Sequence, residues 1–166
     1  MTVHRRILVV GVGSDFGDDR VGQYVVDRLA TRLPPGCEVR KVRAPADLLD
    51  QLDDVAELHV VDGCRGAGPP GLIIQGDAGS ARFSGVCFRG THDLDVVSAL
   101  RLAEALGQLP PRATIWGVEM AKDGSPQSLR AALTMEVAAG ADRLVDRIVT
   151  ELHGATVGYS ESHRHA

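Results

Sequence analysis

Three short stretches of this chain combine ionisable side chains with turn residues, and each has residue types that can do chemistry. They span residues 11–22 (GVGSDFGDDRVG), 62–64 (DGC) and 91–93 (THD). Carboxylates and neutral imidazoles bind borderline divalent ions such as nickel and zinc, whereas a thiol needs a nearby base or cation before it attacks as a nucleophile. The stretches therefore indicate either a metal site or a nucleophile, depending on how the fold groups them.

The stretch 11–22 has the glycine content of a dinucleotide-binding turn. Its spacing is GxGxxxG rather than GxGxxG, and the lysine of a phosphate-binding loop is missing. Asp15, Asp18 and Asp19 would also place negative charge where a pyrophosphate meets a helix N-terminus. A dinucleotide-binding oxidoreductase therefore stands as an alternative hypothesis and not as the leading one.

Asp18 and Asp19 open the helix that is expected after this turn. A carboxylate at the N-cap or in the first turn is stabilised by free backbone N–H groups and by the helix dipole, typically by ~0.5–2 kcal/mol. This structural role is predicted for Asp18. Because two adjacent carboxylates cannot serve as the same cap, Asp19 is free to point into the space above the sheet, and Asp19 is the predicted ligand.

Asp62 follows an apolar run that predicts a buried strand ending in a carboxylate. A buried, unpaired carboxylate is costly, so Asp62 should meet a cation, a metal or several N–H donors. The structural alternative is a turn or capping aspartate. Cys64 lies two residues further on without a Cys-His-Asn signature around it, so a small buried thiol is expected, with a catalytic nucleophile as the alternative.

His92 lies between a strand-like run and a helical pattern, with Thr91 as the predicted N-cap. The positive end of a helix dipole disfavours imidazolium, which keeps His92 in the neutral form that binds metals. A structural surface histidine is the alternative. His59 lies inside a strand-like run and is predicted to be a satisfied core or edge residue.

These residues must be positioned by an alternation of strands and helices. Runs rich in Val and Ile predict strands at residues 6–12, 37–43, 56–62, 71–75, 83–89 and 112–119. Apolar periodicity predicts helices at residues 18–33, 46–53, 93–106 and 126–153, the last of them either continuous or divided near Thr134 or Gly140. Strands that are apolar almost throughout are covered on both faces, which predicts a three-layer α/β/α domain with a parallel-rich, mixed central sheet.

Asp19, Asp62 and His92 each follow a different predicted strand or the turn after it. Because the carboxyl ends of parallel strands share one edge of a sheet, the three side chains can meet there. Two carboxylates and one imidazole form an open site with positions left for water or for groups from a partner. Asp19, Asp62 and His92 are therefore the predicted metal ligands and the predicted catalytic residues.

Length and composition exclude several classes of function. A chain of 166 residues with 44% hydrophobic residues is expected to fold as one domain, here residues 1–153, followed by a disordered tail at 154–166. The net charge of -4 leaves no broad basic surface for nucleic acid. Three widely spaced cysteines are typical of reduced thiols in the cytoplasm, and no apolar run is long enough for a membrane span.

Taken together, three blocks of the sequence resemble the nickel-iron hydrogenase maturation proteases. The blocks are GVGSDFGDDRVG, VVDGCRGAGPPG and THDLDVVSALRLAEALGQLPPRATIWGVE, and the similarity spans roughly residues 6–150. The first loop departs from the family in having Ser14 where Asn is frequent, in being one residue shorter than the commonest form, and in having Arg20 where small residues are frequent. These departures leave open which precursor is preferred.

The resemblance implies an endopeptidase that removes the C-terminal extension of a hydrogenase large-subunit precursor after nickel insertion. The family's metal-recognising positions fall on Asp19, Asp62 and His92. Nickel would then arrive with the precursor, with no resident organic cofactor, and the partner would be that precursor rather than nucleic acid or a membrane. A non-catalytic nickel-binding escort protein is the alternative from a different class.

Overall fold

The computed structural model describes residues 6–88, 94–122 and 132–161, and side chains are described as far as residue 155. Its strands are β1 (Arg6–Val12), β2 (Cys37–Val42), β3 (Val55–Arg65), β4 (Ile73–Gly76), β5 (Cys87–Phe88) and β6 (Arg112–Glu119). Its α-helices are α1 (Val21–Leu29), α2 (Val96–Ala105) and α3 (Met135–Glu161). Short 3₁₀ helices are η1 (Gly17–Arg20), η2 (Pro45–Gln51) and η3 (Ala81–Phe83).

The sheet has the order β2-β1-β3-β6-β4, with β5 paired to the end of β3. The pairs β1–β2, β1–β3 and β3–β6 are parallel, whereas β4 runs antiparallel to β6 and β5 antiparallel to β3. The prediction of a parallel-rich, mixed sheet is therefore confirmed.

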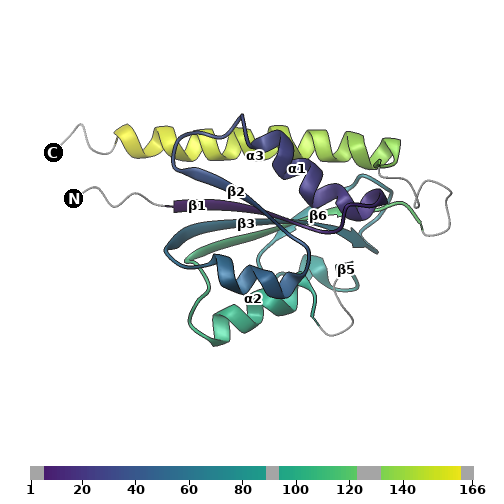
Figure 1. Cartoon of the computed structure of the whole chain (residues 1–166), viewed down its shortest axis with the longest axis horizontal. Helices are drawn as coiled ribbons and strands as arrows, with labels where there is room; N and C mark the ends of the chain where they lie inside the picture. Colours follow the sequence, from purple (N-terminus) through teal and green to yellow (C-terminus); the bar gives the residue numbers. More distant parts are fainter. Residues whose placement is uncertain (1–5, 89–93, 123–131, 162–166) are drawn as a thin grey trace.

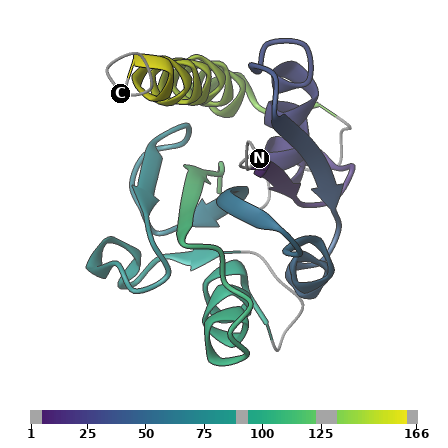
Figure 2. The ribbon, with the colours of Figure 1, turned by 90° about the vertical axis from the view of Figure 1, so that its left-hand side faces the viewer.

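Helices cover both faces of this sheet (Figures 1 and 2). α1 and α3 pack on one face, where Val9, Val61 and Trp116 point into a buried cluster with apolar residues of both helices. α2 and η2 lie on the other face, where Leu8, Val60 and Ile115 are buried. Successive side chains along each strand point to opposite faces of the sheet and so contribute to two hydrophobic cores. The three-layer α/β/α fold is confirmed.

Several predicted element bounds are wrong. β3 does not end at Asp62 but continues to Arg65, because its last two residues pair with β5. The strand expected at 83–89 is reduced to Cys87–Phe88 behind η3. The α2 helix begins at Val96 rather than at residue 93, because the Asp95 carboxylate accepts from the Ser98 N–H and serves as the N-cap in place of Thr91.

The C-terminal helix extends further than the sequence predicted, and it is continuous past Gly140, which was one of the two alternatives. α3 is one helix of 27 residues that passes through Gly140 and Gly154. Gly140 lies inside the helix and has a packing role there. A Cβ atom at this position would lie 2.3 Å from the Gly71 carbonyl oxygen, so glycine allows the helix to approach the loop before β4. The helix was expected to end at residue 153 but continues to Glu161, which a single glycine allows because one helical glycine costs only about 1 kcal/mol relative to alanine.

Replacing these two glycines should have opposite effects on stability. Gly140→Ala should lower the free energy of unfolding by about 1–3 kcal/mol, because the new methyl group meets backbone that cannot move aside cheaply. Gly154→Ala should raise it by about 0.5–1 kcal/mol, since nothing lies within 4 Å of the added Cβ. Urea denaturation of both variants measures the difference, and a destabilising Gly154→Ala would contradict a helix that continues through residue 154.

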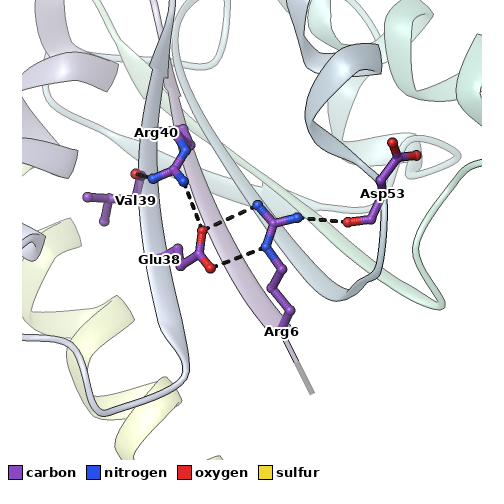
Figure 3. A network of polar contacts seen from close by, with 5 residues as sticks. All are labelled: Arg6, Glu38, Val39, Arg40 and Asp53. Carbon is purple, nitrogen blue, oxygen red and sulfur yellow. Dashed lines mark hydrogen bonds and ion pairs between the residues drawn. The ribbon is translucent and has the colours of Figure 1, made fainter. Parts of the chain in front are cut away.

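Polar contacts join β1, β2 and the turn before β3 at the amino edge of the sheet (Figure 3). The Arg6 guanidinium donates to both Glu38 carboxylate oxygens at 3.3 Å and to the Asp53 carbonyl oxygen at 2.7 Å. Arg6 and then Arg40 lower the pKa of Glu38. Because this network lies at the opposite end of the strands from the predicted ligands, it aligns the strands without taking part in the site.

No helix among the described residues has the length and apolar character needed to cross a membrane.

Candidate functional site

Asp19 and Asp62 lie where the order of the strands reverses. From β1 the chain passes to β2 on one side, whereas β3 pairs with β1 on the other side. In open α/β sheets, the carboxyl ends of the two strands at such a switch point leave a crevice in which ligands bind. Asp19 follows β1 in η1, and Asp62 lies near the end of β3, so both acids belong to this crevice.

The loop after β1 folds back on itself and holds the Asp19 carboxylate. The Ser14 N–H donates to Asp19 Oδ2 at 3.0 Å, and Gln23 Nε2 donates to the Gly13 carbonyl oxygen at 2.6 Å. Gly13 has a φ of +145°, and a Cβ atom there would lie 2.0 Å from the Asp19 carbonyl oxygen. Glycine is therefore required for the loop to close around Asp19.

The remaining glycines of this loop serve packing rather than phosphate binding. A Cβ atom at Gly11 would lie 2.2 Å from the Gly22 carbonyl oxygen, and one at Gly22 would lie 2.4 Å from the Val12 carbonyl oxygen. The glycines let α1 lie directly on β1. Because Asp19 already accepts from the Ser14 N–H, an anion of the protein occupies a donor that a phosphate would use, which argues against a dinucleotide site.

Asp62 is fully buried and only half satisfied. Its Oδ1 accepts from the Gly63 N–H at 2.8 Å, and its Oδ2 has no hydrogen-bond partner among the described residues. Burial, followed by the negative charges of Asp19 and Asp95, raises the pKa of Asp62 well above its usual value. The side chain lies on the same face of β3 as Val60 and Cys64, the face covered by α2. A buried carboxylate with an unused oxygen gains strongly from a cation.

The structure thus brings together two of the three predicted ligands. His92 lies outside the described residues, and among the residues that are described no three His, Cys, Asp or Glu side chains group as a ready metal site. Asp95 is an acid that the sequence analysis missed, since its charge reaches Asp62 from the N-terminus of α2. The sequence signal was present, because an aspartate directly before an apolar helical pattern is a typical N-cap.

Asp18 lies in the first turn of its helix, as predicted, but its hydrogen bonds reach other parts of the chain. The residue at the N-cap of η1 is Phe16, which makes no side-chain cap. Asp18 instead accepts from the backbone N–H groups of Ala121 and Thr134 at 2.9 and 2.8 Å and from the Thr134 hydroxyl at 3.1 Å. The carboxylate therefore ties η1 to the segments after β6 and before α3.

His59 and Cys64, which were expected to be buried rather than to take part in the chemistry, are both buried and hydrogen-bonded. His59 is 1% exposed; its Nδ1 accepts from Trp116 Nε1 at 3.0 Å, and its Nε2 lies 3.0 Å from Glu57 Oε1, so it is a satisfied core residue as predicted. Cys64 is fully buried, and burial followed by the nearby Glu119 charge raises the pKa of its thiol. A thiol held protonated in this way is a poor nucleophile.

A broad hollow of about 890 Å³ lies elsewhere, beside the first residues of β6. The turn after β4 and the loop before β6 line it, with Ser80, Pro111 and Arg112 among the lining residues. β6 is parallel to β3, and Arg112 pairs with Glu57 while Gly117 pairs with Asp62. The hollow therefore lies at the amino end of the parallel strands, away from the two acids, and is not the candidate site.

No protein-family model and no curated protein sequence matches the chain. Several solved structures match it. The hydrogenase maturating endopeptidase HybD from E. coli superposes with a TM-score of 0.68 at 25% identity, over 90% of this chain and 93% of that one. The hydrogenase 2 maturation peptidase from Thaumarchaeota archaeon SCGC_AB-539-E09 superposes with a TM-score of 0.65 at 25% identity, over 89% and 98%.

The chain resembles the hydrogenase maturation proteases. A third structure, the [NiFe] hydrogenase maturation protease HybD from Thermococcus kodakarensis, has a TM-score of 0.67 at 20% identity over 89% of this chain and 98% of that one, and supports the fold alone. The resemblance noted from the sequence motifs is thereby confirmed across nearly the whole chain. Because the two neighbours at 25% identity are named endopeptidase and peptidase, the prediction of a peptidase is supported as well.

Proposed function

We propose that this protein is an endopeptidase that removes the C-terminal extension of a nickel-iron hydrogenase large-subunit precursor after nickel insertion. The observation that carries the proposal is the fully buried Asp62 Oδ2, which lies near Asp19 in the crevice between β1 and β3 and finds no hydrogen-bond partner in the part of the chain that the structure describes. A buried carboxylate oxygen is stabilised by a cation, and a precursor that brings nickel would supply one. The likeness to maturation endopeptidases gives the reaction class.

The residues of the chain have separate roles in this proposal. Asp62 offers Oδ2 to the cation, while its Oδ1 is oriented by the Gly63 N–H. Asp19 is oriented by the Ser14 N–H through Oδ2, which leaves Oδ1 for the cation. His92 is proposed as the imidazole ligand by the resemblance. Nickel held by the precursor supplies a cation that orients or polarises the scissile peptide.

The remaining ligands must come from the precursor. Two carboxylates and one imidazole do not complete the coordination of a closed metal site, so groups of the large subunit would fill the open positions. Recognition of the metal and recognition of the protein substrate would then be the same event. A nickel-binding escort protein would use the same ligands without cleavage, so cleavage itself distinguishes the two functions.

Incubation of the purified protein with nickel-loaded precursor tests the proposal. Release of the C-terminal extension, followed by mass spectrometry, is the expected result. Binding of the loaded precursor without release of a peptide would favour the escort protein. A rise in thermal stability with NAD or NADP in place of any effect of the precursor would favour the oxidoreductase.

Cys64→Ser should leave cleavage within about threefold of wild type, because the thiol is held in its protonated form: burial, followed by the Glu119 charge, raises its pKa, and the thiol donates to Glu119 Oε2 at 3.8 Å. The cleavage rate of loaded precursor is the measurement, with circular dichroism as the control for folding. A folded but inactive Cys64→Ser protein would instead indicate a cysteine nucleophile.

A further inference from the structure

Asp18 and Asp19 are adjacent acids with opposite environments. Within the described residues, the Asp18 carboxylate accepts three hydrogen bonds, all from segments more than 100 residues away in sequence, and they engage both of its oxygens. The Asp19 carboxylate accepts a hydrogen bond from Ser14 of its own loop. A carboxylate whose lone pairs are engaged by three donors is a poor cation ligand, whereas its neighbour keeps an oxygen available.

Asp18 also lies at the positive end of a long helix. Thr134 directly precedes α3, and its carbonyl oxygen accepts the first bond of that helix from the Ala138 N–H at 2.9 Å. The Asp18 Oδ1 accepts from the Thr134 N–H, so the carboxylate of η1 acts at the N-terminus of a helix remote in sequence. The helix dipole stabilises a negative charge at this point, and the contact therefore favours one placement of η1.

η1 has little to hold it in place by itself. It is a 3₁₀ turn of four residues, and its N-cap residue makes no side-chain hydrogen bond. Such short 3₁₀ segments are marginal without tertiary contacts. The Asp18 bonds hold η1 toward β6 and α3, while the lack of a Cβ at Gly13 leaves the room that the Asp19 carbonyl needs beside the end of β1.

We infer that Asp18 is a positioning residue, which anchors η1 to α3 and to the end of β6 so that the Asp19 carboxylate faces Asp62. This inference rests on the proposed function only in assigning the precursor's nickel to Asp19. The hydrogen bond from the Ser14 N–H to Asp19 Oδ2, 3.0 Å long, reports the position of Asp19 without metal or substrate.

The test compares Asp18→Asn with Tyr24→Phe. Asparagine keeps the size of the side chain and one acceptor oxygen, but it replaces the other oxygen by an N–H₂ donor, so either the Ala121 N–H or the Thr134 N–H loses its acceptor and the anchor is weakened. Tyr24→Phe removes the 3.0 Å bond from the Tyr24 hydroxyl to Asp142, which also reaches α3 but from α1. Amide hydrogen exchange at Ser14, measured by NMR, should become roughly 10-fold faster in Asp18→Asn and stay unchanged in Tyr24→Phe.

Cleavage of nickel-loaded precursor gives the second readout. We expect kcat/KM to fall roughly 10–100-fold in Asp18→Asn at a temperature where the protein is fully folded, and to stay near wild type in Tyr24→Phe. If Asp18→Asn does not fold, Thr134→Val removes only the hydroxyl bond to Asp18 and should lower kcat/KM about threefold.

Two results would overturn the inference: wild-type Ser14 exchange in the folded Asp18→Asn protein, or an equal loss of Ser14 protection in Tyr24→Phe. A wild-type protein that cuts no precursor would count against the proposed function instead. The Ser14 exchange rates would still decide the role of Asp18.

Discussion

Asp62→Asn should abolish precursor cleavage and at the same time make the protein more stable. The wild-type carboxylate is fully buried, one of its oxygens has no hydrogen-bond partner within residues 6–88, 94–122 and 132–161, and the charges of Asp19 and Asp95 oppose its own. Asparagine keeps the oxygen that accepts from the Gly63 N–H and replaces the charged oxygen by a neutral donor. The free energy of unfolding should rise by about 1–2 kcal/mol, and cleavage should fall by at least about 100-fold.

Thermal denaturation and cleavage of nickel-loaded precursor should be measured on the same preparation. A gain of this size corresponds to a rise in the melting temperature of roughly 2–8 °C for a domain of this length. Asp50→Asn, on the exposed surface of η2, makes the same chemical change away from the site and should alter neither quantity. An Asp62→Asn protein that is active and less stable would show that Asp62 is a structural residue with a partner of its own.

Removing nickel from the precursor should remove cleavage completely. The described part of the site offers Asp19 and Asp62 and no full ligand set, so its own affinity for a metal is expected to be modest. Nickel-free precursor of the same sequence therefore lacks the cation that would bind the buried Asp62 oxygen, and it should stay uncut at any enzyme concentration.

The experiment presents nickel-free and nickel-loaded precursor in parallel and follows release of the extension by mass spectrometry. Reagents that trap serine or cysteine nucleophiles serve as the control and should have little effect on the loaded substrate, because the Cys64 thiol is buried and has a raised pKa. Equal cleavage of both forms would remove metal recognition from the mechanism and leave an endopeptidase of another kind.

Local pattern was enough to predict most of the strands. β1 and β6 were predicted to the residue, and β2 to within one, because apolar runs rich in Val and Ile between turn residues have few alternatives to a buried strand. The ends of other elements depended on contacts remote in sequence. β3 is longer than predicted because β5 pairs with its end. Gly140 is part of α3 rather than a break in it, and its lack of a side chain makes room for the Gly71 backbone.

The candidate site divides in the same way. The sequence by itself determined that Asp19 and Asp62 lie at the ends of two different strands, since residue order and strand pattern are local properties; that these strands, β1 and β3, are neighbours was decided by the tertiary structure. It also separated Asp19 from Asp18, because one cap position cannot hold two carboxylates. Only the tertiary structure decided what Asp18 binds, since Ala121 and Thr134 lie more than 100 residues away. The same holds for the unpaired oxygen of Asp62, because the burial of one atom depends on every element packed around it.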